Sequence, residues 1–400
     1  MKEWITYKLK DICLKVTDGS HFSPTAREDG YPMFSVKDME EYGFNYDSCK
    51  RISIEDFNTL KANDCVPQKG DILVAKDGSF LKQIFVCNET REEAILSSIA
   101  IFRPNPEYVI PEFLCYILKS PKVYNYIAQN CVSGSALPRI VLKAFKEVEV
   151  SIPSIDVQKW IISKLTPIDQ KIKLNRQIND NLEQQAQALY KSWFVDFEPF
   201  KDGNFVESDL GLIPEGWSVG NLLDVAELYD SKRKPLSGMQ RSAMKKIYPY
   251  YGATSIMDYV DNYIFDGIYL LMGEDGSVVT DDGYPFLQYV SGKFWPNNHA
   301  HVMQGKNGYS TEMLHCFLLK KNISEIVTGA VQAKISQGNM KKISLVIAPN
   351  EVLNEFAPVI DRMYSKIRAI HFENQQLETM RDTLIPKFMS GELKINEIDC

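Results

Sequence analysis

The sequence lacks the features of membrane proteins and of disulfide-stabilised proteins. No apolar run approaches the length that a bilayer-spanning helix needs, and the opening MKEWITYKLKD carries charges where a signal peptide has its apolar core. The eight cysteines are scattered and include no C-x-x-C pair, so a disulfide framework is not expected. Scattered thiols are typical of a reducing compartment, and we therefore expect a cytoplasmic protein without a membrane partner.

Recognisable catalytic motifs are missing as well. No G-x-x-x-x-G-K-[ST] loop is present, which excludes a P-loop ATPase. The stretch NPEY, from Asn105 to Tyr108, approaches the N-P-P-Y motif of amino-methylating enzymes, but it lacks the second proline, and no glycine-rich strand–turn–helix precedes it. We interpret NPEY as a turn, and a DNA-modifying enzyme with a degenerate methyltransferase site remains an alternative.

Three histidines of the second half are candidate metal ligands. His299 and His301 alternate along an expected strand, and His315 follows. Because no acidic residue or cysteine stands near them in zinc-like spacing, structural roles are favoured and no metal site is predicted. The sequence is that of a binding protein, for which we expect no catalytic residue and no cofactor bound by this chain.

Size and charge indicate a globular protein of several domains. The 400 residues are too many for one ordinary domain, and 44% hydrophobic with 24% charged residues is a globular composition. The net charge of −7 neither suggests nor excludes nucleic acid, because a binder needs only a local basic stripe. One such stripe runs from Lys232 to Lys246, with six basic residues and no acidic one. A solvated loop is its alternative interpretation.

An internal repeat organises the chain. Trp4, Leu9, Asp11 and Ile12 recur in the same spacing at Trp217, Leu222, Asp224 and Val225. Three further echoes follow in the same order: KDGS (76–79) with EDGS (274–277), EFLCYIL (112–118) with EMLHCFL (312–318), and SGSALPRI (133–140) with TGAVQAKI (328–335). The conserved order of the echoes predicts two related domains.

A heptad pattern of apolar residues closes each half. Steps of four and three run from Ile161 to Trp193, and the pattern returns 195 positions later, with Asn179 and Asn374 at matching places. A narrow apolar seam with a wide polar back favours two long helices that pair as a coiled coil; helices that each pack on their own domain are the alternative. The residues predicted to pair the helices are Ile161, Leu165, Ile168, Ile172, Leu182, Leu189, Phe356, Ile360, Met363, Ile367, Leu377 and Leu384.

Local signals set the elements and the domain boundaries. The runs DILVA, IYLLM and SLVIA predict strands and EFLCYIL predicts a helix, so each domain is of mixed α/β class. Ser154 and Asn350 are expected helix N-caps, and a kink or a restart is expected at Pro167 and Pro358. The predicted plan is a first domain (1–152), a central helical spacer (153–198), a connector (199–215), a second domain (216–347) and a C-terminal helical spacer (348–395).

These stretches resemble a known family, the specificity (S) subunits of Type I restriction–modification systems. The resemblance is carried most specifically by the helical stretch that ends in LYKSWFVDFEPF, the connector with GLIPEGW, and LIPKFMSGEL near the end. In addition, DGSHF and VKDM in the first half, and GEDGSV with TGAVQAKISQGNMKKI in the second, are similar to target-recognition domains of that family. The resemblance covers nearly the whole chain.

The resemblance implies a non-catalytic DNA-recognition subunit with an internal pseudo-two-fold repeat. Each target-recognition domain would read one half of a split site in double-stranded DNA, while the two helices form an antiparallel coiled coil that sets the spacing. The helices would also dock two methyltransferase subunits, and restriction/translocase subunits would join them. S-adenosylmethionine, ATP and magnesium are then expected on the partner subunits. A two-domain protein-binding scaffold is the remaining alternative.

Candidate DNA contacts follow from the residue types that phosphates and bases require. Cations contact phosphates and position a protein, whereas base reading needs side chains that donate or accept hydrogen bonds at a groove edge. The aromatic end LYKSWFVDF is interpreted as packing the helix end onto a domain or a partner. The predicted DNA-binding residues are Ser20, His21, Lys37, Lys76, Arg139, Lys232, Arg233, Lys234, Arg241, Lys245, Lys246, Tyr251, Thr254, Gln332, Lys334, Ser336 and Gln337.

Overall fold

The computed structural model describes residues 4–134, 137–329 and 332–392. The chain forms two compact units, of which the first combines Met1–Leu174 with Asn374–Cys400 and the second is Asn175–Glu373. This division differs from the predicted plan, because each long helix is shared between the two units. Residues 393–395, with which the predicted C-terminal spacer ends, and residues 1–3 of the predicted first domain lie outside the described residues.

The first unit is built on a four-stranded antiparallel sheet. Its order is β2 (Cys13–Asp18), β10 (Ile99–Pro104), β7 (Ile72–Ala75) and β8 (Ile84–Val86). The run DILVA is confirmed as a strand, since it contains β7, and all four residues of β7 are buried. The other strands are β1 (Ile5–Lys8), β3 (Tyr31–Phe34), β4 (Met39–Glu40), β5 (Gly43–Phe44), β6 (Lys50–Ile52), β9 (Ala94–Ile95), β11 (Val132–Ser133), β12 (Arg139–Ile140) and β13 (Glu149–Ile152), and the short helices are α1 (Ile54–Ala62), α2 (Pro111–Lys119), α3 (Pro121–Asn130) and α4 (Leu142–Lys146).

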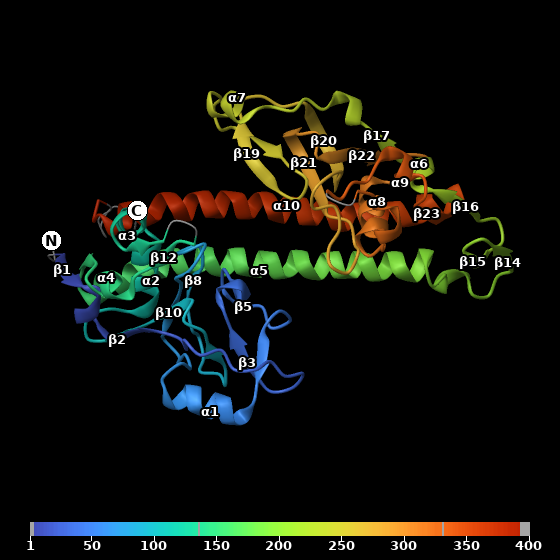
Figure 1. Cartoon of the computed structure of the whole chain (residues 1–400). Helices are drawn as coiled ribbons and strands as arrows, with labels where there is room; N and C mark the ends of the chain where they lie inside the picture. Colours follow the sequence, from blue (N-terminus) through green and yellow to red (C-terminus); the bar gives the residue numbers. More distant parts are fainter. Residues whose placement is uncertain (1–3, 135–136, 330–331, 393–400) are drawn as a thin grey trace. The chain divides into compact units, whose positions relative to one another are not determined.

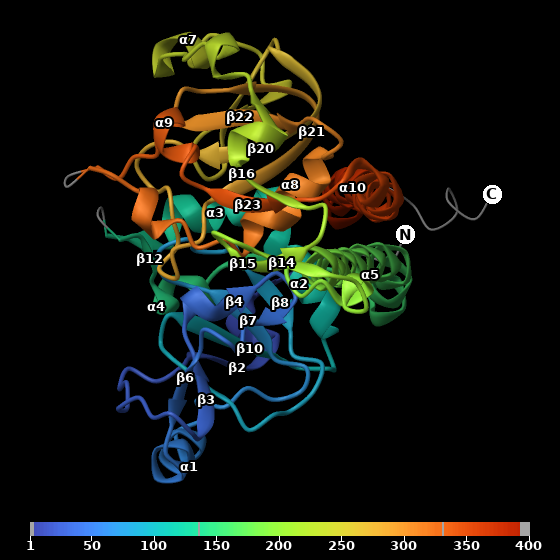
Figure 2. The same ribbon diagram turned by 90° about the vertical axis from the view of Figure 1, so that its right-hand side faces the viewer.

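The second unit repeats this topology. The strands β17 (Ala226–Leu228), β22 (Ala300–Gly305), β20 (Phe265–Gly273) and β21 (Leu287–Pro296) occur in the same order, and all neighbours are again antiparallel. Figure 2 labels β20, β21 and β22 of this sheet. Two strands, β18 (Tyr248–Tyr251) and β19 (Ile256–Val260), extend the sheet. A separate antiparallel pair, β16 (Ser218–Asn221) with β23 (Ser344–Ile347), matches β1 with β13. The short helices are α6 (Leu222–Val225), α7 (Gly238–Ser242), α8 (Thr311–Leu319) and α9 (Gln337–Met340). The predicted mixed fold with an internal repeat is therefore confirmed.

Two long helices, α5 (Ile155–Phe194) and α10 (Asn350–Met389), run without interruption (Figure 1). A kink or a restart is expected at Pro167 and Pro358, and neither helix restarts there. A proline removes one backbone hydrogen bond, but the loss is tolerated where tertiary packing holds the helix, and Leu165 and Phe356 beside the prolines are fully buried. The expected cap at Asn350 is also displaced by one position, because this residue is already the first of its helix.

The two helices are antiparallel in both units. In the first unit Trp160 packs edge-on against Phe388, with ring centroids 5.6 Å apart, and Arg381 donates to Asp169 at 3.0 Å. In the second unit Phe194 packs against Phe356 at 4.7 Å, and Asn175 donates to Glu373 at 2.8 Å. Of the residues predicted to pair the helices, Ile161, Leu165, Ile172, Phe356, Ile360 and Ile367 are buried, while Ile168, Leu182, Leu189, Met363, Leu377 and Leu384 are half-buried.

The aromatic end of α5 packs onto its own unit. The rings of Phe194 and Phe197 lie 5.7 Å and 5.4 Å from that of Trp217, the first residue of the second repeat. After the helix the chain forms a hairpin of β14 (Phe205–Ser208) and β15 (Gly211–Pro214). The predicted connector is thus ordered, and its Phe200 lies 5.8 Å from Trp193 near the end of α5 and 5.1 Å from Trp217.

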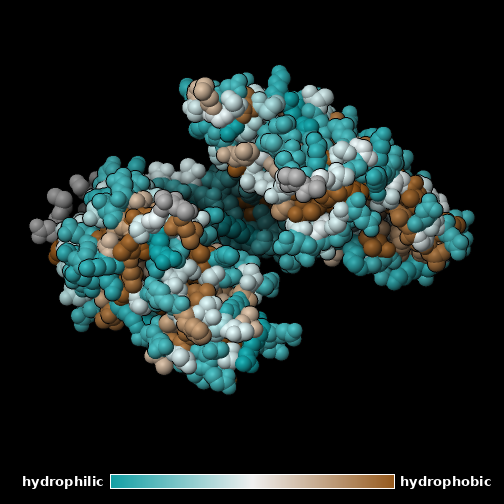
Figure 3. All heavy atoms as spheres, in the orientation of Figure 1, coloured by the Kyte–Doolittle hydropathy of each residue, from teal (hydrophilic) through white to brown (hydrophobic). Residues whose placement is uncertain are grey.

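In each unit one short helix lies between the sheet and a long helix. Tyr116 of α2 donates its hydroxyl to Asp169 of α5 at 2.6 Å, and Nδ1 of His315 in α8 lies 2.8 Å from the hydroxyl of Tyr364 in α10. Figure 3 shows a largely hydrophilic outer surface on the face in view. Within the described ranges, none of the helices combines the length and the apolar character that a bilayer crossing requires.

Acidification is expected to destabilise the second unit through His315. Burial lowers the pKa of His315 from 6.5 to about 4, so the folded protein keeps the ring neutral while the unfolded chain protonates it. This contribution is complete above pH 6.5 and is lost as the pH falls towards 4, by about 2 kcal/mol between pH 7 and pH 5. Thermal melts of the protein and of His315→Gln, which cannot titrate, measure the difference. An equal loss in both proteins would contradict the assignment.

Candidate nucleic-acid interface

In the first unit, the DGS turn after β7 is tied to the β11–β12 hairpin. Gly78 donates its backbone N–H to Pro138 at 2.8 Å, and Ile140 donates to the carbonyl of Lys76 at 2.9 Å. Asp77 and Arg139 form an isolated antiparallel bridge, and their side chains pair at 3.2 Å. Two separate sequence echoes, KDGS and SGSALPRI, are therefore one structural device, whose residues 135–136 lie outside the described part.

The second unit builds the same device from EDGS and TGAVQAKI. Gly276 donates its N–H to Ala333 at 2.9 Å, and Ile335 donates to the carbonyl of Glu274 at 2.8 Å. Asp275 bridges Lys334 just as Asp77 bridges Arg139. We call residues 132–140 and 328–335 the recognition hairpins; the structure brings the predicted residues Arg139, Gln332 and Lys334 together with the DGS turns on these two hairpins.

Glycine is required at the start of each hairpin tip. Gly134 and Gly329 have φ of +88° and +97°. An added Cβ would lie 2.7 Å from the carbonyl oxygen of Leu137 in the first hairpin, and 2.1 Å from that of Gln332 in the second. A side chain at Gly134 or Gly329 would therefore collide with this backbone, and beside Gly329 both Gln332 and Lys334 are exposed.

An ion pair supports each DGS turn, with opposite sign in the two units. In the first unit buried Lys76 pairs with Asp18 at the end of β2, at 2.7 Å. In the second unit the matching position is Glu274, which pairs with Arg233 at 2.6 Å. The contact is retained while the charges are exchanged, so Lys76 and Arg233 both hold the turn in place. Lys76 is 4% exposed and the side chain of Arg233 is 11% exposed, and their predicted contact with DNA stays a prediction.

The second recognition hairpin is further held by Asp230 and His301. The carboxylate of Asp230 accepts hydrogen bonds from Val302 at 2.9 Å and Gln337 at 2.7 Å, and it lies 2.6 Å from Nδ1 of His301. The other ring nitrogen of His301 faces the carbonyl of Ile335 at 2.8 Å, so both ring nitrogens face acceptors. Burial would raise the pKa of Asp230, but its hydrogen bonds, that from His301 foremost, and the charge of His301 hold the pKa below its ordinary value.

This cluster has the ligand atoms of a metal site, but protein partners already engage these atoms. One ligand atom each of Asp230, Glu274 and His301 lies within 4.8 Å of the others. However, Arg233 donates to Glu274, and both ring nitrogens of His301 have protein partners. His299, expected on a strand with His301, instead lies in the turn before β22, beside Asp275. The arrangement is that of a structural ion-pair network.

The basic stripe divides into paired and exposed cations. Arg241 lies 3.2 Å from Asp258 and stacks over the ring of Tyr250, and Lys246 donates to Asp258 at 2.8 Å. Lys232 lies over the ring of Tyr229, 4.8 Å from its centroid, but is exposed, as are Lys234 and Lys245. The six cations are thus not one free surface. Arg233, Arg241 and Lys246 are engaged by carboxylates, although Lys246 is itself exposed. Lys232, Lys234 and Lys245 are exposed and form no ion pair with the described residues.

The remaining predicted residues occupy varied positions. Ser20, a predicted base reader, is buried and donates its hydroxyl to the carbonyl of Phe22 at 2.7 Å, and its predicted role stays a prediction. Ser336 caps α9 by accepting from Asn339 at 3.1 Å, and Tyr251 is half-buried beside Phe294. The residues that stay exposed are His21, Lys37, Arg139, Thr254, Gln332, Lys334 and Gln337.

Asp230, Glu274 and His301 were not predicted to position the hairpin. One signal was available in the sequence. KDGS and EDGS differ only in the charge of their first residue, and a sign change at an otherwise repeated position indicates an ion pair whose partner has changed with it.

Comparisons with known proteins agree with this repeated architecture. The chain is 25% identical over 420 aligned positions to the MjaIX specificity subunit of Methanocaldococcus jannaschii, covering 99% of this chain and 95% of that one. It is 22% identical over 480 positions to the HindI specificity subunit of Haemophilus influenzae, covering 98% and 100%. The crystal structure of the S subunit from M. genitalium has a similar fold, with a TM-score of 0.53, 15% identity and coverage of 97% and 96%.

The Type I restriction modification DNA specificity domain matches the chain twice, over residues 1–184 and 214–379. The two matched segments correspond to the two halves of the internal repeat. The chain belongs to the Type I restriction–modification DNA specificity family and is a DNA-recognition subunit of such a system.

Proposed function

We propose that each recognition domain reads one half of a two-part DNA site. The recognition hairpins carry the exposed polar and basic side chains Arg139, Gln332 and Lys334, which are of the kinds that read base edges. The single observation that carries the proposal is the repeat of one device, a DGS turn bridged to a hairpin, in both units. Two copies of one reading device favour two half-sites over one continuous site.

The long helices are proposed to set the gap between the half-sites and to dock two methyltransferase subunits. A continuous helix of 40 residues is a suitable spacer, because its length is set by its number of residues at about 1.5 Å each. On this proposal the chain is not catalytic and works in the cytoplasm. S-adenosylmethionine, ATP and magnesium would be bound by the methyltransferase and restriction/translocase subunits.

Mapping of methylated bases tests the proposal. The chain is co-expressed with its methyltransferase in a host that lacks other DNA methylation, and the modified bases are located by sequencing. The expected motif has two specified parts separated by a gap of unspecified bases. A continuous motif would refute two half-sites, and methylation by this chain without the methyltransferase would refute a non-catalytic subunit.

Three exposed lysines of the basic stripe, which form no ion pair with the described residues, are expected to contact phosphates. Replacing Lys232, Lys234 and Lys245 with Ala should weaken DNA binding about equally on all sequences. The slope of log K against log salt concentration should become less steep by up to about 3, since each phosphate contact contributes roughly 0.9. Binding measured from low to high salt gives the slope.

A matched triple variant controls for the change in net charge. Lys201, Lys320 and Lys366 are exposed residues of the same unit outside the stripe. Their replacement with Ala should leave the salt dependence nearly unchanged. If both triple variants behave alike, the stripe makes no specific phosphate contacts; if the methylated motif changes instead, these lysines read bases.

A further inference from the structure

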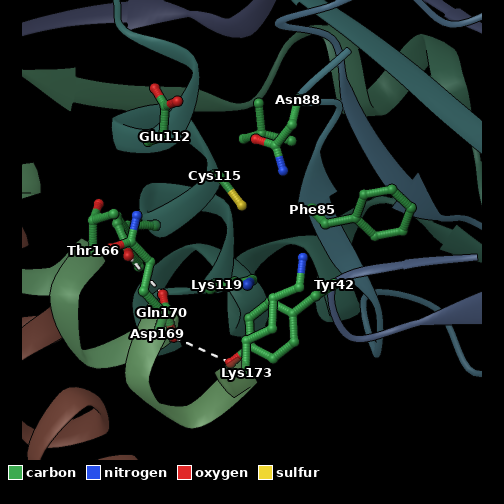
Figure 4. Close-up of a pocket in the computed structure, with 12 residues that line it drawn as sticks. Tyr42, Phe85, Asn88, Glu112, Cys115, Lys119, Thr166, Asp169, Gln170 and Lys173 are labelled. Atoms are coloured by element: carbon green, nitrogen blue, oxygen red, sulfur yellow. Dashed lines mark hydrogen bonds between the residues drawn. The ribbon is translucent and has the colours of Figure 1, made fainter. Parts of the chain in front are cut away.

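A cavity of about 390 Å³ lies in the first unit between the sheet, α2 and α5. Figure 4 shows the side chains of Asn88, Cys115, Lys119 and Lys173 around this space. Glu112 and Val86 also contribute to the wall. Among the described residues, none forms a hydrogen bond or an ion pair with the side chain of Glu112, Lys119 or Lys173. The volume is within the range of small-molecule sites, roughly 300–1,000 Å³.

The internal repeat identifies the same place in the second unit. The echo of EFLCYIL in EMLHCFL matches Glu112 with Glu312 and Cys115 with His315, and the helix repeat matches Asp169 with Tyr364 and Lys173 with Arg368. The ladders extend the match into the sheet: Ile72 pairs with Val86 across β7 and β8, while Leu270 pairs with Tyr289 across β20 and β21. Because KDGS aligns β7 with β20, Val86 corresponds to Tyr289.

In the second unit this place is filled by the phenol of Tyr289. Its hydroxyl donates to Glu312 at 2.7 Å, and Arg368 donates both to Glu312 at 2.8 Å and to the same hydroxyl. The ring packs against Tyr364 and His315, with centroids 5.1 Å and 5.7 Å apart. A carboxylate and a cation thus hold one phenolic hydroxyl between the sheet and the helices.

The first unit keeps the polar groups but has smaller side chains at three positions. A carboxylate (Glu112) and a cation (Lys173) remain, whereas Val86, Cys115 and Asp169 stand where the second unit has Tyr289, His315 and Tyr364. Tyr116 is larger than its counterpart Cys316, but its hydroxyl is engaged by Asp169 at 2.6 Å. The cavity, which Tyr42 and Tyr116 also line, thus lies where the repeat places the phenol of Tyr289 in the second unit.

We propose that this cavity is a binding site for a phenol, held by its ring against Val86 and Cys115 and by its hydroxyl between Glu112 and Lys173. The ligand is either a free phenolic compound or the side chain of a tyrosine on a partner protein. The inference does not depend on how the two domains read DNA.

Binding of p-cresol, which is the tyrosine side chain without its backbone, tests the site. Ligand-observed NMR with the full chain should give saturable binding of p-cresol, about fivefold tighter than toluene, as expected of one net hydrogen bond. Equal binding of the two compounds, or no saturable binding of p-cresol, would overturn the proposal. N-acetyl-tyrosinamide separates the sources: binding as tight as that of p-cresol indicates a tyrosine of a partner, and weaker binding indicates a free phenol.

A substitution at Val86 can place an aromatic ring of the chain itself in the cavity, as Tyr289 does in the second unit. Val86→Tyr should abolish p-cresol binding and should melt about 2–4 °C above Val86→Phe, its matched control without the hydroxyl. A Tyr variant that still binds p-cresol, or that melts no higher than the Phe variant, would overturn the proposal. Should both rings disturb folding, Lys173→Met at the helix surface removes only the cation and should reduce the preference for p-cresol over toluene. An unchanged preference would argue against the site.

Discussion

Replacement of Arg233 with Ala is expected to destabilise the second unit by about 3–5 kcal/mol, the cost of leaving buried charges without their partner. The side chain of Arg233 is only 11% exposed and donates to Glu274 at 2.6 Å and to the carbonyl of Ala300 at 2.6 Å. Asp230 lies 3.5 Å away. Loss of the guanidinium would leave Glu274 and Asp230 facing each other beneath the second recognition hairpin, so DNA binding should fail together with stability.

Denaturant unfolding measures the loss, and the neighbouring Lys232→Ala is the matched control. Lys232 is exposed and should cost less than about 0.5 kcal/mol. A double-mutant cycle with Glu274→Gln isolates the pair, because Arg233→Ala should cost much less once the carboxylate is neutral. If Arg233→Ala changes DNA affinity and its salt dependence without loss of stability, the residue is a phosphate contact after all.

Periodic and repeated features of the fold could be predicted from the sequence. The heptads placed two long helices close to their observed bounds, and the echoed segments indicated two related domains. Strands such as DILVA could be predicted because a short apolar run bounded by turn residues is typical of a buried strand. Each of these signals depends on local spacing alone.

Features that depend on tertiary contacts could not be predicted. From the sequence, Pro167 predicts a kink or a restart of the helix, yet α5 is continuous, with Leu165 and Ile161 buried beside the proline. Lys76, Arg233 and Arg241 have the residue type of DNA contacts, but their use is decided by carboxylates that are distant in sequence, such as Asp18 and Asp258. The bridge between a DGS turn and a recognition hairpin likewise joins segments about sixty residues apart. Residue type limits what a side chain can bind, and only its neighbours decide what it does bind.

Exchange of one recognition domain is expected to change one half of the DNA site completely. The block from Trp217 to Ser344 holds the second recognition hairpin, the DGS turn and the network of Asp230, Glu274 and His301. The strand pair β16–β23, at which the block begins and ends, is antiparallel in the chain and matches β1–β13, so a relative's block has equivalent ends. Methylation at the original motif should fall to background and be replaced by a hybrid motif.

The most direct test of independent reading is to sequence the methylated DNA of cells that express the exchanged chain with the methyltransferase. The block of the MjaIX specificity subunit of Methanocaldococcus jannaschii that matches residues 217–344 is a suitable donor. Our account predicts that one half of the motif becomes that of the donor, while the other half and the gap stay as in the parent. A change in both halves, or an active complex whose motif is unchanged, would contradict it.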